Sequence, residues 1–407
     1  MKTVIVILLM TFAAAAASHA ATAADASAPR GGGDGAGDCT IAWRQMIPSA
    51  ELPTAVMTID STEVAIRPLP KAKPKDPASA ALFVGEAIKS KTPIYPGKTY
   101  AFTLVGKDGK TQLYVNGYPD GPAIATRLGA HIKSAPGVTV DRLAAAMAGD
   151  DILRMFAEQI EPRDIKTVAH RGINKYAPEN TRISYVQAVA AHAPIVEMDT
   201  ALSKDGVIVL MHDPTVNRTT NGKGKVADLT ADELAKLDAG SWKDKKYAGE
   251  PVPRLTDIAD VCRGKTIMML DLKAEGQGKA VAEWLDKGGF ARDQVILAPW
   301  TDAEGAALRQ YVKDIPMIRL TTKVPTDTID DAYFAKMKQT GFSAFSVSWP
   351  YLTKEFVDAA HKNGMKIYVW TVNDNPEIAG SALLGVDGVI TDDAAATSKT
   401  LADLARK

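Results

Sequence analysis

The sequence predicts an α/β fold, a TIM (β/α)8 barrel preceded by a small β-rich domain. After about residue 165, eight short apolar runs alternate with amphipathic helical segments, as expected for eight β/α units in about 240 residues. Before residue 140, short alternating runs and turn residues indicate β-strands instead. No glycine-rich dinucleotide turn follows the first run of the C-terminal part, which argues against a doubly wound open sheet.

The bulk composition is that of a globular protein. A chain of 407 residues fits two domains, or one large barrel with an addition. Hydrophobic residues make up 46% and charged residues 24%, which is an ordinary balance. The formal net charge is zero, so nothing suggests nucleic acid or an anionic membrane as a bulk partner.

The first residues have the pattern of a secretory signal peptide, Met1–Ala20. Lys2 supplies the positive end, Val4–Ala17 is apolar, and small residues precede the expected cleavage point. The apolar run is short for a membrane-spanning helix of about 20 residues, so no integral membrane segment is expected after signal removal. A periplasmic or secreted protein follows. Residues 21–38, rich in Ala, Gly, Ser and Asp, predict a disordered leader.

Residues 39–140 predict the small β-rich domain. Thr99–Val105 and Gln112–Asn116 flank an Asp-Gly turn and predict a hairpin. Leu113–Gly117 resembles a strand of lectin-like β-sandwiches. A scaffold, or a module that docks to a surface or partner, is the simpler interpretation, because a fold does not fix a function. Residues 141–164 carry apolar side chains at helical spacing and predict a helical connector.

The two cysteines of the chain, Cys39 and Cys262, leave two possibilities open. In an oxidising compartment they would be able to form a disulfide between the two domains. The alternative is a pair of separate thiols. Neither has a second cysteine close in sequence, so a zinc–thiolate site is not expected.

Residues 165–407 predict the barrel. The candidate strands are Thr167–His170, Ile195–Thr200, Ile267–Leu272, Val295–Ala298, Met317–Leu320, Ala344–Val347, Lys366–Val372 and Gly388–Ile390. The clearest helical segments between them are Thr181–Ala191, Ala280–Lys287, Thr353–Asn363 and Asn375–Leu384. In such a barrel the active site lies at the carboxyl ends of the strands.

Three carboxylates lie near such ends. Glu197 and Asp199 are two residues apart in one strand, so both point to the same face, and Asp271 ends the next candidate strand. Three carboxylates without a thiolate favour one hard divalent cation, Mg²⁺ or Ca²⁺. The alternative role is ion pairing with Arg171 and Lys273.

Two histidines supply candidate proton carriers. His170 ends the first strand and His212 follows an apolar run, and an unperturbed imidazole can act as acid or base near neutral pH. Arg171 and Lys273 are placed to stabilise charge on phosphate oxygens. Glu179 either orients Arg171 through a salt bridge or is a carboxylate at a helix N-terminus. This equipment suits metal-assisted cleavage of a phosphate ester.

These motifs resemble the glycerophosphodiester phosphodiesterase family. The matching segments are His170-Arg-Gly172, Pro178-Glu-Asn-Thr181, Glu197-Met-Asp199, Asp205-Gly206, His212-Asp213, Arg218–Gly224, Asp271-Leu-Lys273, Trp370-Thr-Val-Asn373 and Gly385–Asp392. The resemblance implies hydrolysis of glycerophosphodiesters to an alcohol and glycerol 3-phosphate, with His170 and His212 as the acid/base pair. It also implies that Glu197, Asp199 and Asp271 hold the cation, and that a substrate hydroxyl attacks first to give a cyclic phosphate.

Other interpretations remain. In the resembled family the third carboxylate is often Glu, whereas this chain has Asp271. An Asp-x-Lys at this point is similar to sphingomyelinase D barrels, so a lysophospholipase D or sphingomyelinase D-like activity is the main alternative. Trp370 either packs on the alcohol end of the substrate or belongs to the barrel core. A barrel retained as a non-catalytic surface-binding module is a further possibility.

Overall fold

The computed structural model describes most of the chain from Cys39 onward. The described residues are 39–47, 56–59, 62–71, 78–108, 110–125, 132–134, 140–143, 147–273, 275–288, 291–325 and 329–406. The predicted signal peptide, 1–20, and the predicted leader, 21–38, lie outside them. No helix within the described residues is long and apolar enough to span a membrane.

Eight parallel strands of the described chain close into a barrel, because β11 pairs with both β12 and β19. The strands are β11 (Lys166–Ala169), β12 (Ile195–Leu202), β14 (Ile267–Leu272), β15 (Val295–Ala298), β16 (Met317–Thr321), β17 (Phe342–Ser348), β18 (Lys366–Trp370) and β19 (Gly388–Thr391). The predicted TIM barrel is confirmed, and each predicted strand lies within about two residues of an observed one, which is the usual precision of element boundaries.

The barrel interior is filled by side chains and is not a pore. One apolar cluster gathers inward-facing residues from all eight strands, among them Ile195, Met269, Ile296 and Tyr368. Gly388 is needed at this level, because a Cβ there would lie 2.3 Å from the ring of Tyr368. A second and larger cluster lies between the strands and the surrounding helices. The closed, filled barrel is therefore a rigid base for the side chains at its rim.

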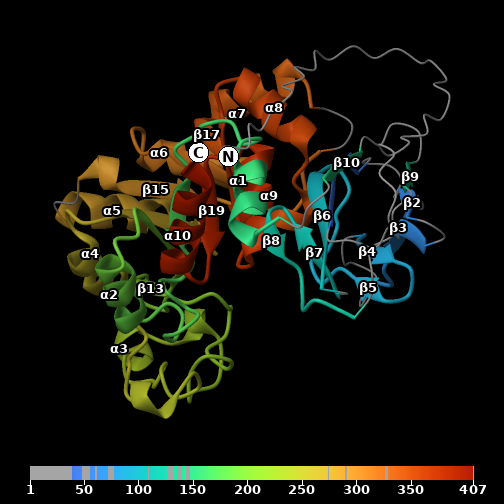
Figure 1. Cartoon of the computed structure of the whole chain (residues 1–407). Coiled ribbons are helices and arrows are strands. Elements are labelled where there is room, and N and C mark those ends of the chain that lie inside the picture. Colours follow the sequence, from blue (N-terminus) through green and yellow to red (C-terminus); the bar gives the residue numbers. More distant parts are fainter. Residues whose placement is uncertain are drawn as a thin grey trace, which may run out of the picture.

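Helices surround the barrel (Figure 1). They are α2 (Arg182–Ala190), α4 (Leu255–Cys262), α5 (Gly278–Gly288), α6 (Asp302–Tyr311), α7 (Asp331–Thr340), α8 (Lys354–Lys362), α9 (Asn375–Leu384) and α10 (Ala394–Ala405), with the 3-10 turns η3 (Arg292–Gln294) and η4 (Trp349–Tyr351). Several begin at a capping residue. The side chains of Thr301, Asp330 and Thr353 each accept a backbone N–H three residues on, which satisfies a donor that the helix itself leaves free.

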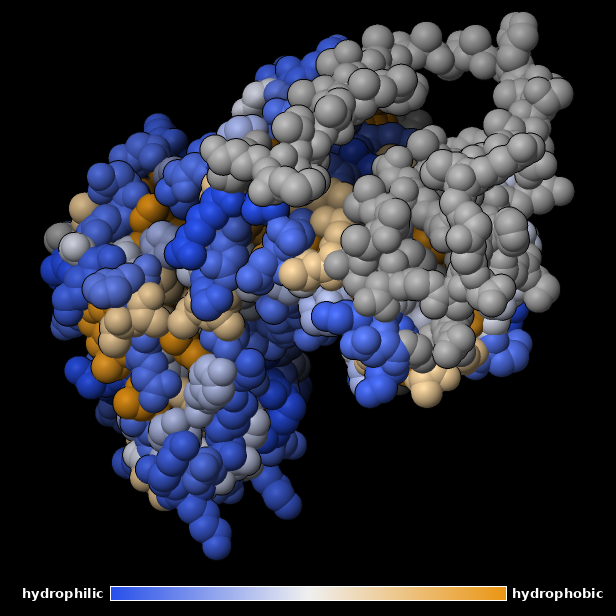
Figure 2. Space-filling view, in the orientation of Figure 1, coloured by the Kyte–Doolittle hydropathy of each residue, from blue (hydrophilic) through white to orange (hydrophobic). Residues whose placement is uncertain are grey.

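A projecting lobe, residues 211–254, interrupts the β/α alternation. It follows β13 (Ile208–Leu210), which pairs antiparallel with the end of β12. The lobe holds η1 (Val226–Asp228), α3 (Ala231–Leu234) and η2 (Lys245–Tyr247) around a small apolar cluster of its own. The face of the lobe that is in view is mostly hydrophilic (Figure 2). Lys243 Nζ donates to the carbonyl of Asn174 at 2.6 Å, so the lobe contacts the rim of the barrel.

The N-terminal region forms two antiparallel sheets that share one apolar cluster. One sheet holds β1 (Cys39–Met46), β6 (Thr99–Lys107), β7 (Lys110–Val115), β8 (Tyr118–Pro119) and β10 (Val140–Leu143), and the other holds β2 (Met57–Ile59), β3 (Thr62–Pro68), β4 (Ala80–Val84), β5 (Ile88–Lys89) and β9 (Ile132–Ser134). The predicted β-rich domain is therefore a sandwich, whereas its likeness to lectins stays a prediction.

The connector differs from its prediction. Helix was expected throughout 141–164, but β10 (Val140–Leu143) pairs with β1, and the helix α1 covers only Gly149–Ala157. Pairing with an exposed sheet edge decides the structure of these first residues over their helical spacing. Of the two options for the cysteines, the structure has the free thiol, because Cys262 is unbridged and fully buried in α4.

Candidate active site

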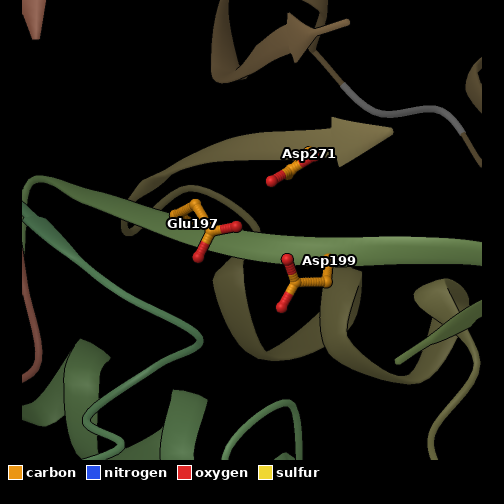
Figure 3. Close-up of side chains that lie close together, drawn as sticks. All are labelled: Glu197, Asp199 and Asp271. Atoms are coloured by element: carbon orange, nitrogen blue, oxygen red, sulfur yellow. The ribbon is translucent and has the colours of Figure 1, made fainter. Parts of the chain in front are cut away.

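Three carboxylates meet at one end of the barrel, as predicted. Oxygen atoms of Glu197, Asp199 and Asp271 all lie within 4.8 Å of one another, and all three side chains are buried (Figure 3). The strand period of two explains their direction, since Ile195 and Met269 face the barrel interior one step earlier. Asp199 and Asp271 are also direct neighbours across the parallel pair β12–β14.

Two cations neutralise part of this charge. Lys273 Nζ lies 2.6 Å from Asp271 Oδ2 and 3.1 Å from Asp199 Oδ1, and Arg171 Nε lies 3.1 Å from Asp199 Oδ2. The alternative role of ion pairing is therefore present. If all three carboxylates were ionised, one negative charge would exceed these two cations. No ion pair to Glu197 is present among the described residues; it accepts the backbone N–H of Arg171 at 2.9 Å.

The protonation of the three acids is set by burial and by their mutual repulsion. Burial and the charges of Asp199 and Asp271 hold the pKa of Glu197 well above its usual value. Burial and Asp199 likewise raise the pKa of Asp271 to about 6, although Lys273 opposes this. Burial also disfavours charge on Asp199, but Lys273 and Arg171 outweigh it and lower the pKa. Such a cluster is stabilised by additional positive charge.

His170 lies at the end of β11 and is held by a carboxylate from β19. Its Nδ1 lies 2.6 Å from Asp392 Oδ1, and Asn174 donates to the same oxygen at 2.8 Å. Burial disfavours charge on Asp392, but the hydrogen bonds from His170, Asn174 and Asn373 prevail and lower its pKa to about 2. The ionised carboxylate accepts the Nδ1 proton, which leaves Nε2 of His170 for proton transfer.

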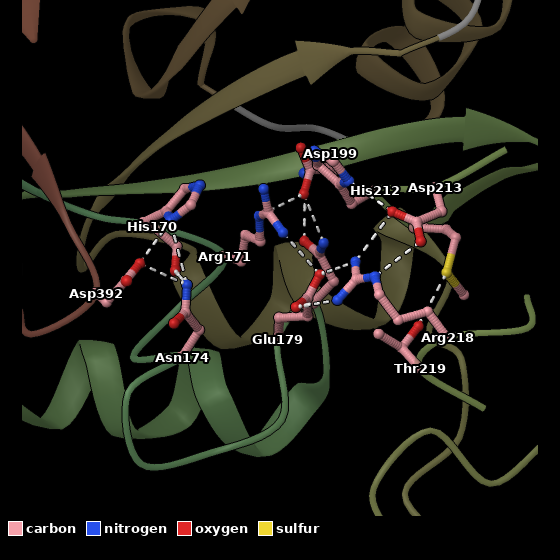
Figure 4. Close-up of polar contacts among 12 residues, drawn as sticks. His170, Arg171, Asn174, Glu179, Asp199, His212, Asp213, Arg218, Thr219 and Asp392 are labelled. Atoms are coloured by element: carbon pink, nitrogen blue, oxygen red, sulfur yellow. Dashed lines mark hydrogen bonds and ion pairs between the residues drawn. The ribbon is translucent and has the colours of Figure 1, made fainter. Parts of the chain in front are cut away.

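His212 follows β13 and has a matching arrangement. Its Nδ1 lies 2.7 Å from Asp213 Oδ1, and Arg218 grips Asp213 through Nε at 2.8 Å and Nη2 at 3.0 Å. The hydrogen bonds of Arg218 hold the pKa of Asp213 far below its usual value. Figure 4 shows the two histidines on opposite sides of Arg171 and Asp199.

The helix-opening segment Pro178–Thr181 links these groups. Glu179 accepts from Arg171 Nη1 at 2.8 Å and from both terminal nitrogens of Arg218, so the predicted ion pair with Arg171 is present. Burial opposes its charge, but the two arginines lower its pKa. Asn180 donates to Asp199 Oδ2 at 2.7 Å and accepts the backbone N–H of Asp199 at 3.2 Å. Its φ of 55° is the unusual backbone that brings it there.

Trp370 ends β18 and faces the same mouth. It is half-buried against the interior cluster and meets the ring of Trp300 edge-on, with centroids 5.8 Å apart. The structure thus brings together all the residues that the sequence singled out.

The sequence did not identify the partners of these groups. Asp392, Asp213 and Asn180 lie inside motifs that were recognised, but no role was assigned to them. Their positions carried a signal, since Asp392 directly follows the last strand and Asp213 directly follows His212. Trp300 was not expected at all, yet its Nε1 donates to Asp271 Oδ1 at 2.7 Å.

The donor set fits a hard divalent cation. All three candidate ligands offer carboxylate oxygens, and their spacing of 4.8 Å or less lets one ion touch all of them. Burial and their mutual repulsion raise the pKa of Glu197, and a bound cation would relieve the repulsion. His170 and His212 are each committed to a carboxylate through Nδ1, which suits proton transfer through the other ring nitrogen.

Comparison with known proteins agrees with this arrangement. The profile of the "Glycerophosphoryl diester phosphodiesterase family" matches residues 170–396, which is more than half of the chain and contains every candidate site residue. The chain belongs to this family. It is therefore an enzyme of the phosphodiester hydrolase class, and residues 39–169, including the sandwich, lie outside the matched range.

Individual relatives support the same assignment. A glycerophosphodiester phosphodiesterase of Caldanaerobacter subterraneus is 32% identical over 247 residues, which is 59% of this chain and 97% of the relative. One of Bacillus subtilis is 29% identical over 250 residues, or 57% of this chain and 85% of the relative. A solved Oleispira antarctica phosphodiesterase, in complex with the product sn-glycerol-3-phosphate, is 25% identical with a TM-score of 0.55, covering 58% of this chain and 96% of that one.

Proposed function

We propose that this chain hydrolyses glycerophosphodiesters to an alcohol and glycerol 3-phosphate, with His170 and His212 as the proton carriers. The observation that carries the proposal is the pair of His–Asp couples on opposite sides of Arg171 and Asp199 (Figure 4). Displacement at phosphorus places the attacking and leaving oxygens roughly in line. A base on one side and an acid on the other are the groups that such a displacement needs.

The protons are balanced within the two couples. One imidazole takes the proton of the attacking oxygen, which in the net hydrolysis comes from water, through Nε2 as the new P–O bond forms. The other gives a proton to the alcohol oxygen as the old P–O bond breaks. Asp392 and Asp213 remain ionised and stabilise whichever ring becomes cationic, because both pKa values lie far below neutrality. After release of the products, the ring that gained a proton loses it to solvent, and the ring that gave a proton takes one up from solvent.

Cationic side chains face the charge of the substrate. Arg171 and Lys273 are largely but not fully covered and lie beside the carboxylates. They keep their protons, since nearby acids raise the pKa of both against the effect of burial. In this proposal they bind the non-bridging phosphate oxygens, and Glu179 keeps Arg171 in place. Trp370 packs on the alcohol part of the substrate.

A divalent cation, Mg²⁺ or Ca²⁺, completes the proposed site. Glu197, Asp199 and Asp271 would hold it, and their unbalanced negative charge supports this assignment. When bound, the cation supplies a positive charge that polarises the phosphate and offsets its developing charge.

The experiment is release of glycerol 3-phosphate from glycerophosphocholine by the purified mature chain, with and without added Mg²⁺ or Ca²⁺. Cation-dependent release is expected. The relatives' names and the product-bound neighbour support the choice of substrate. Release of choline from lysophosphatidylcholine or sphingomyelin, without turnover of glycerophosphocholine, would favour the lysophospholipase D or sphingomyelinase D alternative. No turnover of any of them by folded protein would overturn the proposed reaction.

Localisation is a separate proposal. The signal-like pattern of Met1–Ala20 supports a periplasmic or secreted enzyme. Fractionation of cells that express the full chain, with N-terminal sequencing of the product, tests it. Cleavage near Ala20 and recovery outside the cytoplasm are expected.

A further inference from the structure

The carboxylate of Asp271 is held by a tryptophan from the neighbouring strand. Trp300 Nε1 donates to Asp271 Oδ1 at 2.7 Å, while Lys273 Nζ donates to Oδ2 at 2.6 Å. Both oxygens are therefore fixed by direct donors. Asp199 is held in a similar way, with Asn180 on Oδ2 and Lys273 on Oδ1.

The barrel delivers Trp300 to this point through strand geometry. Ala298 is the cross-strand partner of Asp271 in the β14–β15 pair, and it faces the barrel interior. Trp300 lies two residues further on, so its side chain points the same way. Its backbone is anchored on both sides, because Trp300 N donates to Glu304 at 3.0 Å and Arg319 donates to the Trp300 carbonyl.

The indole ring is also held in place by its neighbours. The ring of Trp370 meets it edge-on at a centroid distance of 5.8 Å and an interplanar angle of 78°. Lys273 Nζ lies 5.1 Å from the centre of the Trp300 ring. Backbone, edge and face of Trp300 are thus all in contact, which leaves the indole little freedom to turn its N–H away from Asp271.

A tryptophan donor has one property that suits a cation site. The indole N–H donates only and carries no charge. It therefore orients a carboxylate oxygen without adding a third cation beside Lys273 and Arg171, and the residual negative charge of the cluster is kept. The oxygen retains further lone-pair capacity, so the hydrogen bond orients Asp271 without using up its ability to bind an ion.

We infer that Trp300 is a positioning residue that presets Asp271 as a cation ligand. The inference rests on the proposed cation site. It assigns to the indole N–H a role separate from packing: removing this one donor while keeping the ring weakens cation binding.

The test measures cation binding directly and does not depend on turnover. Isothermal titration calorimetry with Mn²⁺ and with Ca²⁺ is performed on the purified mature chain, on Trp300→Phe and on Trp370→Phe. Trp300→Phe keeps an aromatic ring and removes the donor, and the dissociation constant is expected to rise about 10- to 100-fold. Trp370→Phe is the matched control for cation affinity, because Trp370 Nε1 has no hydrogen-bond partner among the described residues.

The outcomes separate the inference from the proposed function. If the wild-type chain binds neither ion, the cation site itself is wrong. If it binds and Trp300→Phe binds equally well, Trp300 does not position Asp271. If both variants lose affinity to the same extent, the effect belongs to packing of the aromatic pair and the inference also fails.

A second substitution guards against misfolding of Trp300→Phe. 3-Benzothienylalanine at position 300 replaces only the N–H by sulfur and preserves the shape of the indole. It is expected to weaken cation binding as Phe does, with an unchanged melting temperature. Wild-type affinity in this protein would overturn the inference.

Discussion

The buried polar groups of the barrel and those of the N-terminal sandwich have different roles. In the barrel, buried carboxylates converge on one rim, close enough to His170 and His212 for both histidines to help lower the pKa of Asp199. In the sandwich, two buried polar side chains reach out to the barrel: Lys98 donates to the carbonyl of Leu352 at 2.6 Å, and Asn116 donates to the carbonyl of Pro376 at 2.9 Å. Among the described residues, the sandwich has no cluster of metal-binding side chains. Lys98 and Asn116 instead serve an interface.

That interface falls on two segments of the catalytic rim, the residues after η4 and the first turn of α9. Leu352 and Pro376 follow β17 and β18, so both lie at the carboxyl ends of barrel strands. Asn373, three residues before Pro376, donates to Asp392 at 2.8 Å, and Asp392 holds His170. The barrel supplies the chemical groups, whereas the sandwich supports rim segments, one of which carries part of their scaffold.

The largest expected effect is loss of either proton carrier. His170→Ala or His212→Ala is expected to lower kcat about 10²- to 10⁴-fold, because each removes one proton transfer. The measurement is steady-state turnover of glycerophosphocholine, with circular dichroism to show that each variant is folded. Turnover near the wild-type rate in both variants would remove the barrel rim from the chemistry.

A third His–Asp couple provides the matched control. His361 Nε2 lies 2.8 Å from Asp387 Oδ2, but Asp387 precedes β19 and so lies at the opposite, amino end of the barrel. His361→Ala is expected to retain wild-type turnover, with at most a loss of stability. If His361→Ala lost as much turnover as His170→Ala, the effect would come from loss of structure and would not depend on the location of the couple at the rim.

Removal of the cation sharpens the same comparison. Dialysis against EDTA is expected to abolish turnover, and Mg²⁺ or Ca²⁺ is expected to restore it, because Glu197, Asp199 and Asp271 would repel one another without the ion. The N-terminal sandwich has no expected cation, so its β-sheet signal in circular dichroism remains. Full turnover in EDTA would contradict the proposed cation site.

A smaller effect is expected from the carboxylate that orients His170. Asp392→Asn preserves size but lets the amide hold the wrong ring tautomer, so kcat is expected to fall about 10- to 100-fold, less than on loss of the histidine itself. Because Asp392 is ionised in the folded protein, the variant is also expected to change the pH profile of kcat on its acid side. An unchanged rate and pH profile would show that Asp392 does not position His170.

The strands and the acids were predictable because their physics is local. Strands buried on both faces, such as β14, are continuous apolar runs, and two acids two residues apart must share a face. The site residues could be found since a barrel collects every strand end on one rim. The carboxylate side chains near these strand ends were enough to predict that Glu197, Asp199 and Asp271 lie together.

Partners and boundaries were not predictable in the same way. Asp392 meets His170 across 222 residues of sequence, and no pattern tells which nearby carboxylate will orient which ring. Trp300 was not predicted because a sequence pattern treats tryptophan as an apolar residue, although its indole has one N–H donor. Val140–Leu143 has helical spacing, yet it forms a strand that pairs with β1. Tertiary pairing, which the local pattern does not show, decides this outcome.

The smallest effect concerns the interface between the two regions and is seen in the pH dependence of stability. Lys98 is 1% exposed, and burial lowers its pKa to about 7, although Glu377 opposes this. Burial and Asp374 raise the pKa of Glu377 to about 7. The indole of Trp349 lies between them, 4.6 Å from Lys98 Nζ and hydrogen-bonded to Glu377 at 3.1 Å.

The two groups act in adjacent pH windows. Between about pH 4.5 and 7 the folded chain keeps a proton on Glu377 that the unfolded chain has lost, so the free energy of unfolding falls as pH rises. Between about pH 7 and 10.5 the unfolded chain keeps a proton on Lys98 that the folded chain has lost, so the free energy of unfolding rises with pH. Each limb is limited to about 1.4 kcal/mol per pH unit for one proton.

Urea unfolding of the wild type, Lys98→Met and Glu377→Gln from pH 5 to 9 tests this. The free energy of unfolding of the wild type minus that of Lys98→Met is expected to increase with pH in the range above pH 7. The wild-type value minus that of Glu377→Gln is expected to decrease with pH in the range below pH 7. Met keeps the length of the lysine stem and Gln keeps the hydrogen bond to Trp349, so packing is matched. Flat difference curves would mean that both groups reach solvent when the sandwich is docked, and the interface would then be looser than its hydrogen bonds to Leu352 and Pro376 indicate.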